Sequence, residues 1–526
     1  MELKELLAAL MFFVLIAALM AGFPAALTLA GTAIVFAGVG YGLGAFDLSF
    51  MGLVAQRLFG TMTSEVLIAV PLFVFMGVML ERSRVAEDLL VSMGRLFGTL
   101  RGGLGMSVTI VGGLLAASTG IAGATVVTMG LIALPTMLKH RYDHALACGS
   151  IAAAGTLGQI IPPSIVLVLV GDVLGSAYVT AQRQQGIFAI ETVSVSDLFA
   201  GALIPGLLLV ALYLLYQIGM AWLRPATSPS IPPTESEVAG QGRVRAALTA
   251  LLAPILLIVA VLGSILGGIA TATEAAAVGG IGALLLAGLR VEEGQARLPV
   301  FLAVAGLIGY VLITVLFDLR IGRGTVPARD WVGIALAAIC CLALAWGILV
   351  SLWRVAKTRV LHDVMRQTTL LTAMVFLIVI AAGVFAIVFR GFGGDDMVHR
   401  ALSNLPGGVA GALFVVMFVI FILGFFLDVV EIILIVLPIV APALFLMKVD
   451  PIWLGVMVGV NLQTAYLTPP FGLSLFFLRS VAPATVTTLE IYKGIAPFVA
   501  IQMFCLVLVA LLPATATWLP KLLFGP

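Results

Sequence analysis

The sequence predicts an all-α polytopic membrane protein, and three observations support this. Of its 526 residues, 62% are apolar and only 10% are charged, whereas about 25% are charged in a typical soluble domain. Apolar runs of about 20 residues, the length that a helix needs to cross the hydrocarbon layer, recur along the whole chain. Two segments with paired prolines interrupt such runs 307 residues apart. The net charge of +2 does not suggest a nucleic-acid partner, and the expected surroundings are the lipid bilayer.

Ten apolar runs fit ordinary membrane-spanning helices. They cover residues 6–21, 24–40, 64–80, 198–222, 246–268, 273–289, 298–317, 331–353, 369–389 and 495–513. Two polar segments rich in Pro, Gly or Arg, 223–245 and 319–330, are expected to be loops.

The uncharged segment 102–138 does not fit a single span. It is too long for one crossing, and Ser118, Thr119 and Gly120 interrupt it. Its first arm, 104–117, would be about 21 Å long as a helix, shorter than the roughly 30 Å hydrocarbon layer. We therefore expect a re-entrant helical hairpin whose tip is buried in protein or lines a wet cavity.

A break in a helix is predicted after this hairpin, between Gly155 and Ser164. Pro162 and Pro163 remove two backbone donors and disfavour the α conformation at the residue before them, and the glycines lower the cost of unwinding.

A shift of 307 residues reveals an internal repeat. It superimposes Pro135 on Pro442, Asp143 on Asp450, and Pro162-Pro163 on Pro469-Pro470 without a gap. The second copy contains another apolar hairpin and a second break, between Asn461 and Pro470. An odd number of predicted crossings separates the two copies, so the second copy should be inverted. Inverted repeats with interrupted helices are typical of secondary transporters, which bind substrate and ions where the breaks meet.

These features divide the chain into six segments. They are N-terminal scaffold helices (1–63), a first inverted repeat (64–175), scaffold helices with a cytoplasmic linker (176–289), a two-helix insertion (290–365), a second inverted repeat (366–482) and a C-terminal helix (483–526). In the first repeat, the hairpin covers about 103–138 and the broken helix about 143–175. In the second repeat, the hairpin covers about 409–447 and the broken helix about 450–480.

The acidic residues near these segments have individual interpretations. Asp428, at the second hairpin tip, is interpreted as an ion ligand in preference to a structural hydrogen-bonding group, and for Glu431 the preference is reversed. Glu274 lies near a helix start, where a carboxylate stabilises the helix, and is interpreted as structural. Asp143 and Asp450 precede helices and are interpreted as N-caps.

Enzymatic activity and transition-metal binding are not expected. The four cysteines and four histidines have no metal-ligand spacing, and the chain contains neither a phosphate-binding GxxxxGK[ST] motif nor a catalytic constellation such as HExxH.

Four segments resemble the large membrane (M) subunit of tripartite ATP-independent periplasmic (TRAP) transporters, and the resemblance covers nearly the whole chain. They are GTLGQIIPPSIVLVLVGD (155–172), TATEAAAV (271–278), NLQTAYLTPPFG (461–472) and IYKGIAPF (491–498). The chain is most similar to the subgroup named mannitol/chloroaromatic-type. The resemblance implies an elevator-type, sodium-coupled importer of an organic acid across the bacterial inner membrane. It also implies two partners, a small membrane (Q) subunit and a periplasmic substrate-binding (P) protein, and no cofactor besides Na⁺ as the coupling ion.

The resemblance also implies the site residues. The first sodium site would comprise Ser118, Thr119, Gly120, Gly155, Thr156 and Pro162, the second Gly424, Asp428, Thr464 and Thr468, and the substrate site Pro163, Ser164, Asn461 and Pro470.

Three positions depart from the family pattern: the STGIAG sequence of the first tip, Ala465 and Ala272. The substrate would be a carboxylate, with dicarboxylates and 2-oxo acids as candidates. The alternative is a stand-alone anion/cation exchanger of similar architecture without a binding protein.

Overall fold

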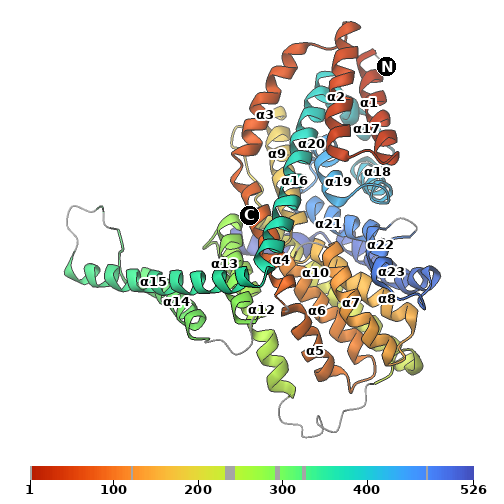
Figure 1. Ribbon diagram of the computed structural model, residues 1–526. Helices are drawn as coiled ribbons and strands as arrows, with labels where there is room; N and C mark the ends of the chain where they lie inside the picture. Colours follow the sequence, from red (N-terminus) through yellow and green to blue (C-terminus); the bar gives the residue numbers. More distant parts are fainter. Residues whose placement is uncertain are drawn as a thin grey trace.

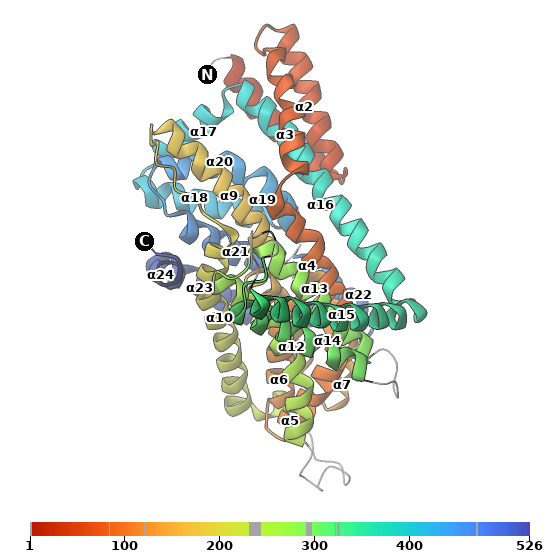
Figure 2. The ribbon, with the colours of Figure 1, turned by 90° about the vertical axis from the view of Figure 1, so that its left-hand side faces the viewer.

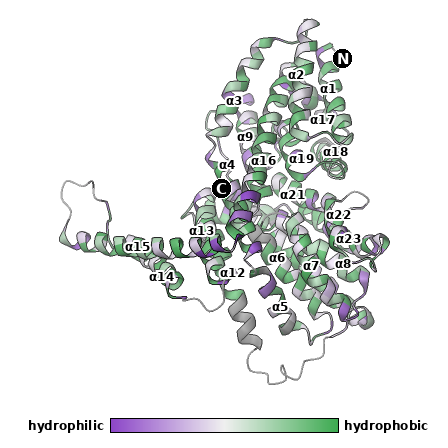
Figure 3. Ribbon diagram, in the orientation of Figure 1, coloured by the Kyte–Doolittle hydropathy of each residue, from purple (hydrophilic) through white to green (hydrophobic). Residues whose placement is uncertain are grey.

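A computed structural model shows helices and connecting loops throughout the residues that it describes. These are 3–83, 85–119, 122–230, 243–290, 297–320, 322, 327–469 and 472–525. In this part of the chain, ten helices are long and apolar enough to cross a membrane, or up to 12 if each of two bent helix pairs is one span. Each of the ten predicted runs coincides with a helix, and apolar residues dominate most of the helices (Figure 3). The predicted all-α polytopic class is therefore confirmed.

The N-terminal region occupies the top of Figure 1 and continues into the centre of the molecule. It comprises α1 (Leu3–Met20), α2 (Ala25–Gly42), η1 (Leu48–Gly52), α3 (Leu53–Met62) and α4 (Glu65–Arg82). The segment Leu48–Met62, which contains η1 and α3, and helix α4 form an apolar pair that bends by 50°. At the bend, the Ser64 hydroxyl accepts a hydrogen bond from the Leu67 N–H and caps α4, which satisfies one of the backbone donors freed there.

The first repeat contains the predicted hairpin and broken helix. Its elements are α5 (Val85–Phe97), α6 (Gly103–Thr119), α7 (Ala122–Lys139), α8 (His144–Thr156), η2 (Leu157–Gln159) and α9 (Ile165–Gln184). Helices α6 and α7 pack against each other and against α8. The Asp143 carboxylate accepts a hydrogen bond from the Leu146 N–H over 2.9 Å, which confirms the predicted N-cap.

Scaffold helices follow the first repeat. They are α10 (Val195–Leu223), η3 (Pro225–Thr227), α12 (Arg243–Leu266) and α13 (Ala272–Arg290). Helix α13 packs along α4. At its start, the Glu274 carboxylate accepts a hydrogen bond from the Thr271 N–H over 2.8 Å, so the structural interpretation of Glu274 is confirmed.

The two-helix insertion forms an arm that projects away from the rest of the chain (Figures 1 and 2). It consists of α14 (Leu298–Leu316) and α15 (Ala328–Lys357). Small residues allow the two helices to approach closely: a Cβ added at Gly306 would lie 2.7 Å from the Cys340 carbonyl oxygen. The arm is attached through α13, where the Arg354 guanidinium donates to the Gly288 carbonyl over 3.2 Å.

The second repeat has the same order of elements. They are α16 (Val360–Gly391), α17 (Gly394–Ser403), α18 (Gly408–Leu423), α19 (Val429–Ile435), α20 (Leu437–Leu446), α21 (Pro451–Leu467) and α22 (Leu473–Val481). Helices α7 and α19 begin at residues 122 and 429, and α8 and α21 begin at 144 and 451, so both pairs are 307 residues apart. Asp450 accepts from the Trp453 N–H over 2.9 Å, which confirms the second predicted cap.

The C-terminal region contains two helices, α23 (Thr488–Leu511) and α24 (Ala514–Phe524), where the sequence predicts one. Pro513, which cannot donate a backbone hydrogen bond, precedes α24. Helix α23 crosses α8 at very short range. A Cβ added at Gly494 would lie 1.8 Å from the Ala145 carbonyl oxygen, and one at Gly149 would lie 2.1 Å from the Gly494 carbonyl oxygen. The helix before the first break is therefore held against α23 by direct backbone contact.

This contact predicts that Gly494→Ala destabilises the protein, because the added methyl group must push the two backbones apart. We expect a loss of about 1–3 kcal/mol, measured as a lower midpoint of thermal unfolding in detergent. Gly38→Ala is the matched control, since Gly38 is also helical and nothing lies within 4 Å of its added Cβ. Equal midpoints for the two variants would contradict the proposed packing.

Candidate functional site

The first break separates α8 from α9. The chain leaves the α-helix after Thr156, forms one 3-10 turn and has no regular structure from Ile160 to Ser164. The Ser164 hydroxyl donates a hydrogen bond to the Gln159 carbonyl over 3.0 Å. This bond satisfies a carbonyl that has lost its helical partner, as a buried backbone group requires.

The first break is enclosed by the first hairpin and the second repeat. The turn η2 packs against α6, α7 and α21, and every residue from Leu157 to Ser164 is buried. A Cβ added at Gly155 would lie 2.4 Å from Val126 Cγ2 on α7, so only glycine fits there without displacing its neighbours. Gly155 and Thr156 therefore lie beside the hairpin, as the predicted first sodium site requires. Gly120 and the side chains of Ser118 and Thr119 lie outside the described residues.

The second break is shorter than the sequence predicts. Helix α21 continues through Leu467, so Asn461 and Thr464 are helical, and the chain leaves the helix only at Thr468. The Thr464 hydroxyl donates to the Val460 carbonyl over 2.8 Å, and the Thr468 hydroxyl donates to the Thr464 carbonyl over 2.7 Å. Helix α21 ends where Thr468 precedes Pro469: Thr468 is extended, because the residue before a proline disfavours the α conformation.

Ser474 is a residue of the second break that the sequence analysis missed. Its hydroxyl donates to the Tyr466 carbonyl over 2.9 Å, so it satisfies a carbonyl at the end of α21 as Ser164 does at the first break. A shift of the sequence by 307 residues does not place Ser164 on Ser474. The internal repeat therefore does not reveal that Ser474 has this role.

The second hairpin tip runs from Gly424 to Asp428, between α18 and α19. A Cβ added at Gly424 would lie 2.4 Å from the Ala465 Cβ on α21, so the tip touches the helix that precedes the second break. The Asp428 N–H donates to the Glu431 carboxylate over 3.1 Å, which confirms the structural interpretation of Glu431. Asp428 itself occupies the N-cap position of α19.

The helices that lead into the two breaks, α8 and α21, touch through equivalent residues of the two repeats. Gln463 Nε2 donates to Thr156 Oγ1 over 3.4 Å, and these residues are 307 positions apart. Thr156 is the last residue of α8, whereas Gln463 lies within α21, before the second break. Tyr213 and Gln502 lie in the same buried interior, and Gln502 Nε2 donates to Tyr213 Oη over 2.8 Å.

Several amide oxygens in this interior are buried without a hydrogen-bond partner among the described residues. They belong to Gln159, Gln463 and Gln502. Unpaired oxygens of this kind are costly unless a cation or water satisfies them. The donor set between the breaks therefore consists of amide, hydroxyl and backbone oxygens, which suit a hard cation. The described part of the chain contains no group of three His, Cys, Asp or Glu residues that could hold a metal ion.

The predicted substrate residues are only partly gathered at the breaks. Pro163 and Ser164 lie in the first break, whereas Asn461 lies in the helical part of α21, where its amide donates to the Met417 carbonyl over 2.7 Å. Pro470 lies outside the described residues. Asn461 is 1% exposed, and every residue of the first break from Ile160 to Ser164 is buried, whereas Thr468 and Pro469 of the second break are half-buried.

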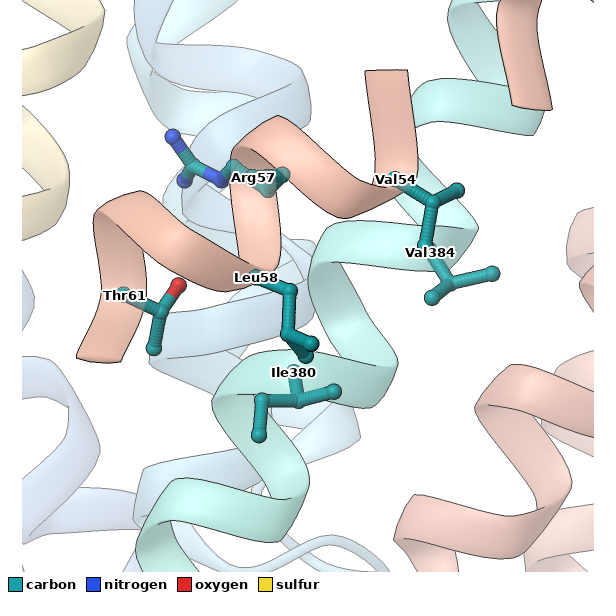
Figure 4. A pocket seen from close by; sticks show the side chains of 6 residues that line it. All are labelled: Val54, Arg57, Leu58, Thr61, Ile380 and Val384. Atoms are coloured by element: carbon teal, nitrogen blue, oxygen red, sulfur yellow. The ribbon is translucent and has the colours of Figure 1, made fainter. Parts of the chain in front are cut away.

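A crevice of about 10 Å³ lies between α3 and α16 (Figure 4). Its lining residues are Val54, Arg57, Leu58, Thr61, Ile380 and Val384. This volume is about that of one water-sized probe, so the crevice does not hold an organic acid.

Comparisons with known proteins agree with this architecture. The family model described as "Tripartite ATP-independent periplasmic transporter, DctM component" matches residues 10–330 and 328–515. The C4-dicarboxylate TRAP transporter large permease protein DctM of Vibrio cholerae is 28% identical, over 98% of each chain. The ectoine TRAP transporter large permease protein TeaC of Halomonas elongata is 25% identical, over 98% of this chain and 99% of that protein.

One relative and one solved structure extend the comparison. The isethionate TRAP transporter permease protein DctMQ of Oleidesulfovibrio alaskensis is 24% identical over 88% of this chain, which spans 59% of that protein. The crystal structure of the Alcanivorax borkumensis YdaH transporter superimposes with a TM-score of 0.53 at 15% identity, covering 89% of this chain and 88% of that chain. At this identity the similarity concerns the fold.

The contact between Thr156 and Gln463 predicts a specific stability pattern. The Thr156 hydroxyl donates to the Ala153 carbonyl one turn back over 2.9 Å and accepts from Gln463. Thr156→Val leaves the buried Gln463 amide without its acceptor, so it should lower the free energy of unfolding by about 1–3 kcal/mol, and Gln463→Leu, which leaves the Thr156 hydroxyl bonded to Ala153, should lower it by less. The double variant should lose less unfolding free energy than the two single variants lose together, because removing both side chains leaves no unpaired group in this contact. Thermal unfolding in detergent measures all three.

Thr180→Val is the matched control for this pair. The Thr180 hydroxyl also bonds one turn back, to the Ser176 carbonyl over 2.9 Å, but it is exposed on α9. Additive losses in the double variant would show that the two repeats are not coupled at this point.

Proposed function

Because the chain belongs to the DctM family, the large membrane subunits of TRAP transporters, we propose that it imports an organic acid anion by sodium symport and an elevator movement. Members of this family are inner-membrane transport permeases and not enzymes, and they work with a small membrane subunit and a periplasmic binding protein. The coupling ion, the elevator movement and the substrate class are the proposed parts.

The contact between the helices that lead into the two breaks is the observation that carries the proposal. The Thr156–Gln463 contact joins equivalent positions of the two repeats inside the protein, where unpaired amide oxygens accumulate. In secondary transporters of this build, unwound carbonyls and helix ends coordinate sodium near the membrane midplane. We propose one ion beside Gly155 and Thr156 and another between Gly424, Asp428 and the end of α21.

Two packed bodies support the elevator movement. The hairpins, both broken helices, α10 and α23 pack mainly on one another, whereas α2, α3, α4, α13 and α16 form a second group. The amphipathic helices α5 and α17 each connect a helix of the second group to a hairpin. We propose that the first body moves relative to the second and that α5 and α17 act as its connectors.

The substrate is proposed to be a small organic anion. The relatives described above are named for C4-dicarboxylates, ectoine and isethionate, each of which carries a carboxylate or sulfonate group. Helix α9 begins inside the protein at Ile165 without a side-chain cap from Ser164, so its first N–H groups are available to an anion. Pro163, Ser164, Asn461 and Pro470 remain the proposed substrate residues.

Uptake into proteoliposomes tests this proposal. The chain would be reconstituted with the small membrane subunit and binding protein encoded beside it, and radiolabelled succinate, ectoine and isethionate would be offered under an inward sodium or proton gradient. We expect sodium-driven uptake of at least one of these acids only when the binding protein is present. Uptake that ignores the sodium gradient would exclude sodium coupling, and uptake without the binding protein would favour the stand-alone exchanger.

The second ion site makes a separate prediction. Asp428→Asn removes a negative charge next to the proposed ion, so the sodium concentration for half-maximal uptake should rise by about tenfold, with the protein still folded. Asp450→Asn is the matched control, because asparagine caps helices as well as aspartate does and Asp450 caps α21 away from the hairpin tip. An unchanged sodium response in Asp428→Asn would assign Asp428 to a structural role.

A further inference from the structure

The two connectors, α5 and α17, begin with the same arrangement of charges. They lie toward opposite ends of the molecule (Figure 1), and each carries an aspartate in its first turn, Asp88 in α5 and Asp395 in α17. These aspartates are 307 positions apart, so they occupy equivalent positions of the two repeats. Each forms an ion pair with an arginine in the last turn of α13 or α16. Both helices belong to the group of α2, α3, α4, α13 and α16, which is the stationary body of the proposed elevator.

In the first repeat, Asp88 pairs with Arg290 at the end of α13. Arg290 Nη1 lies 2.8 Å from Asp88 Oδ2. Helices α13 and α4 pack side by side, and at their starts the Thr273 hydroxyl donates to the Glu65 carbonyl over 2.8 Å. The two helices have nearly the same length, 18 residues in α4 and 19 in α13. Arg290 therefore lies beside the end of α4, where the chain turns into α5.

In the second repeat, Asp395 pairs with Arg390 at the end of α16, the helix that precedes the connector. Arg390 Nε lies 2.7 Å from Asp395 Oδ2, so the pair bridges the short turn between α16 and α17. The residue 307 positions before Arg390 is Ser83. The two repeats therefore form the same pairing at the start of the connector with arginines from non-equivalent positions.

The favourable effect of a negative charge on a helix start does not explain these pairs. An acidic residue stabilises the first turn of a helix without any partner, and Glu87 and Asp396 do this in the two connectors. Both are exposed, and neither forms an ion pair with any of the described residues. Asp88 and Asp395 differ from them because each has an arginine of the stationary body within bonding distance.

The rest of each connector packs on a hairpin. The Ser107 hydroxyl of α6 donates to the Met93 carbonyl of α5 over 2.9 Å, and α17 packs on α20. The chain then enters each hairpin through a glycine with a positive φ, Gly102 at 75° and Gly407 at 93°, a conformation that favours glycine. Each connector thus has a charged end on the stationary body and a glycine end at the hairpin.

We propose that Asp88–Arg290 and Asp395–Arg390 are positioning pairs, which hold the start of each connector on the stationary body and confine bending during transport to the glycine ends. The proposal rests on the proposed function, because it requires a mobile body that the connectors guide. All four side chains are partly exposed, so each pair contributes only modestly to stability. When a pair is lost, the first turn of the connector separates from the stationary body more often. Fewer molecules are then ready to move, and transport slows without a change at the substrate site.

Hydrogen exchange measured by mass spectrometry tests the first pair without any need for transport. Asp88→Asn and Arg290→Gln each break the pair, so the peptide that covers α5 should exchange about threefold faster, as the strength of an exposed ion pair implies. The double variant should exchange no faster than Asp88→Asn alone, because the pair is already lost. Glu87→Gln is the matched control, since it removes a charge from the same helix turn but breaks no ion pair, and its exchange should stay close to that of the wild type.

The second pair should behave in the same way. Asp395→Asn and Arg390→Gln should accelerate exchange in α17, with Asp396→Asn as the matched control. Equal exchange in the wild type and in all variants would overturn the proposal. Additive increases in the double variants, or equal increases in the controls, would show that the charges act only on their own helix ends and would overturn it as well.

Uptake kinetics test the positioning role. With the small membrane subunit and the binding protein present, the maximal uptake rate should fall about threefold in Asp88→Asn and in Asp395→Asn, and about ninefold when both are combined, because the two pairs are far apart and independent. The substrate concentration for half-maximal uptake and the midpoint of thermal unfolding should not change. A general loss of packing would lower the midpoint instead.

Faster exchange with an unchanged maximal uptake rate would overturn the positioning role and assign the pairs to stability alone. A change in the half-maximal substrate concentration alone would also overturn it. These outcomes are separate from those of the proposed function. If wild-type uptake is independent of sodium, the coupling part of the proposed function fails, and the exchange and maximal-rate results still decide the role of the two pairs.

Discussion

The structure depends on one constraint, which is that every backbone donor and acceptor inside a membrane protein needs a partner. Two helices break inside the protein, and each break frees carbonyl groups that water cannot reach. Ser164 and Ser474 take one such carbonyl each through their hydroxyl groups, and the Thr464 and Thr468 hydroxyls bond carbonyls one turn back on α21. Among the described residues near the breaks, the amide oxygens of Gln159, Gln463 and Gln502 are buried without a partner, which a cation could offset.

The two repeats are related in sequence, but their backbone groups near the breaks find hydrogen-bond partners in different ways. In the first repeat, a 3-10 turn and five irregular residues separate α8 from α9, whereas α21 stays helical through Leu467. The tight contacts differ as well: Gly155 accommodates Val126 of the hairpin, while in the second copy Gly424 of the hairpin accommodates Ala465. The two contacts involve different arms of the hairpins, since Val126 lies on the second arm, α7, whereas Gly424 follows the first arm, α18. The bond between Thr156 and Gln463 joins the helices that precede the two breaks.

Much of the fold could be predicted from the sequence because apolar length, proline and the 307-residue repeat are all local or periodic signals. The hairpins, the first break and the caps at Asp143 and Asp450 follow from such signals. The late end of α21 could not be predicted, because glycine and proline in a segment indicate a break but not how many helical residues precede it. Ser474 and Gln463 were missed because their roles depend on tertiary contacts. Ser474 bonds the Tyr466 carbonyl across the second break, and Gln463 bonds Thr156, 307 positions away.

The arm formed by α14 and α15 shows how the chain accommodates extra helices without disturbing the breaks. The two helices pack mainly on each other, through Gly306 against Cys340 and Gly347 against Ala303, and their outer faces are apolar and exposed. The arm is joined to α13, where the added Cβ of Gly288 would meet Ser351 and Arg354 binds the Gly288 carbonyl. Helix α13 belongs to the group of helices around α4 and α16, and not to the group that carries the hairpins. An addition at this point therefore enlarges the group of helices around α4 and α16.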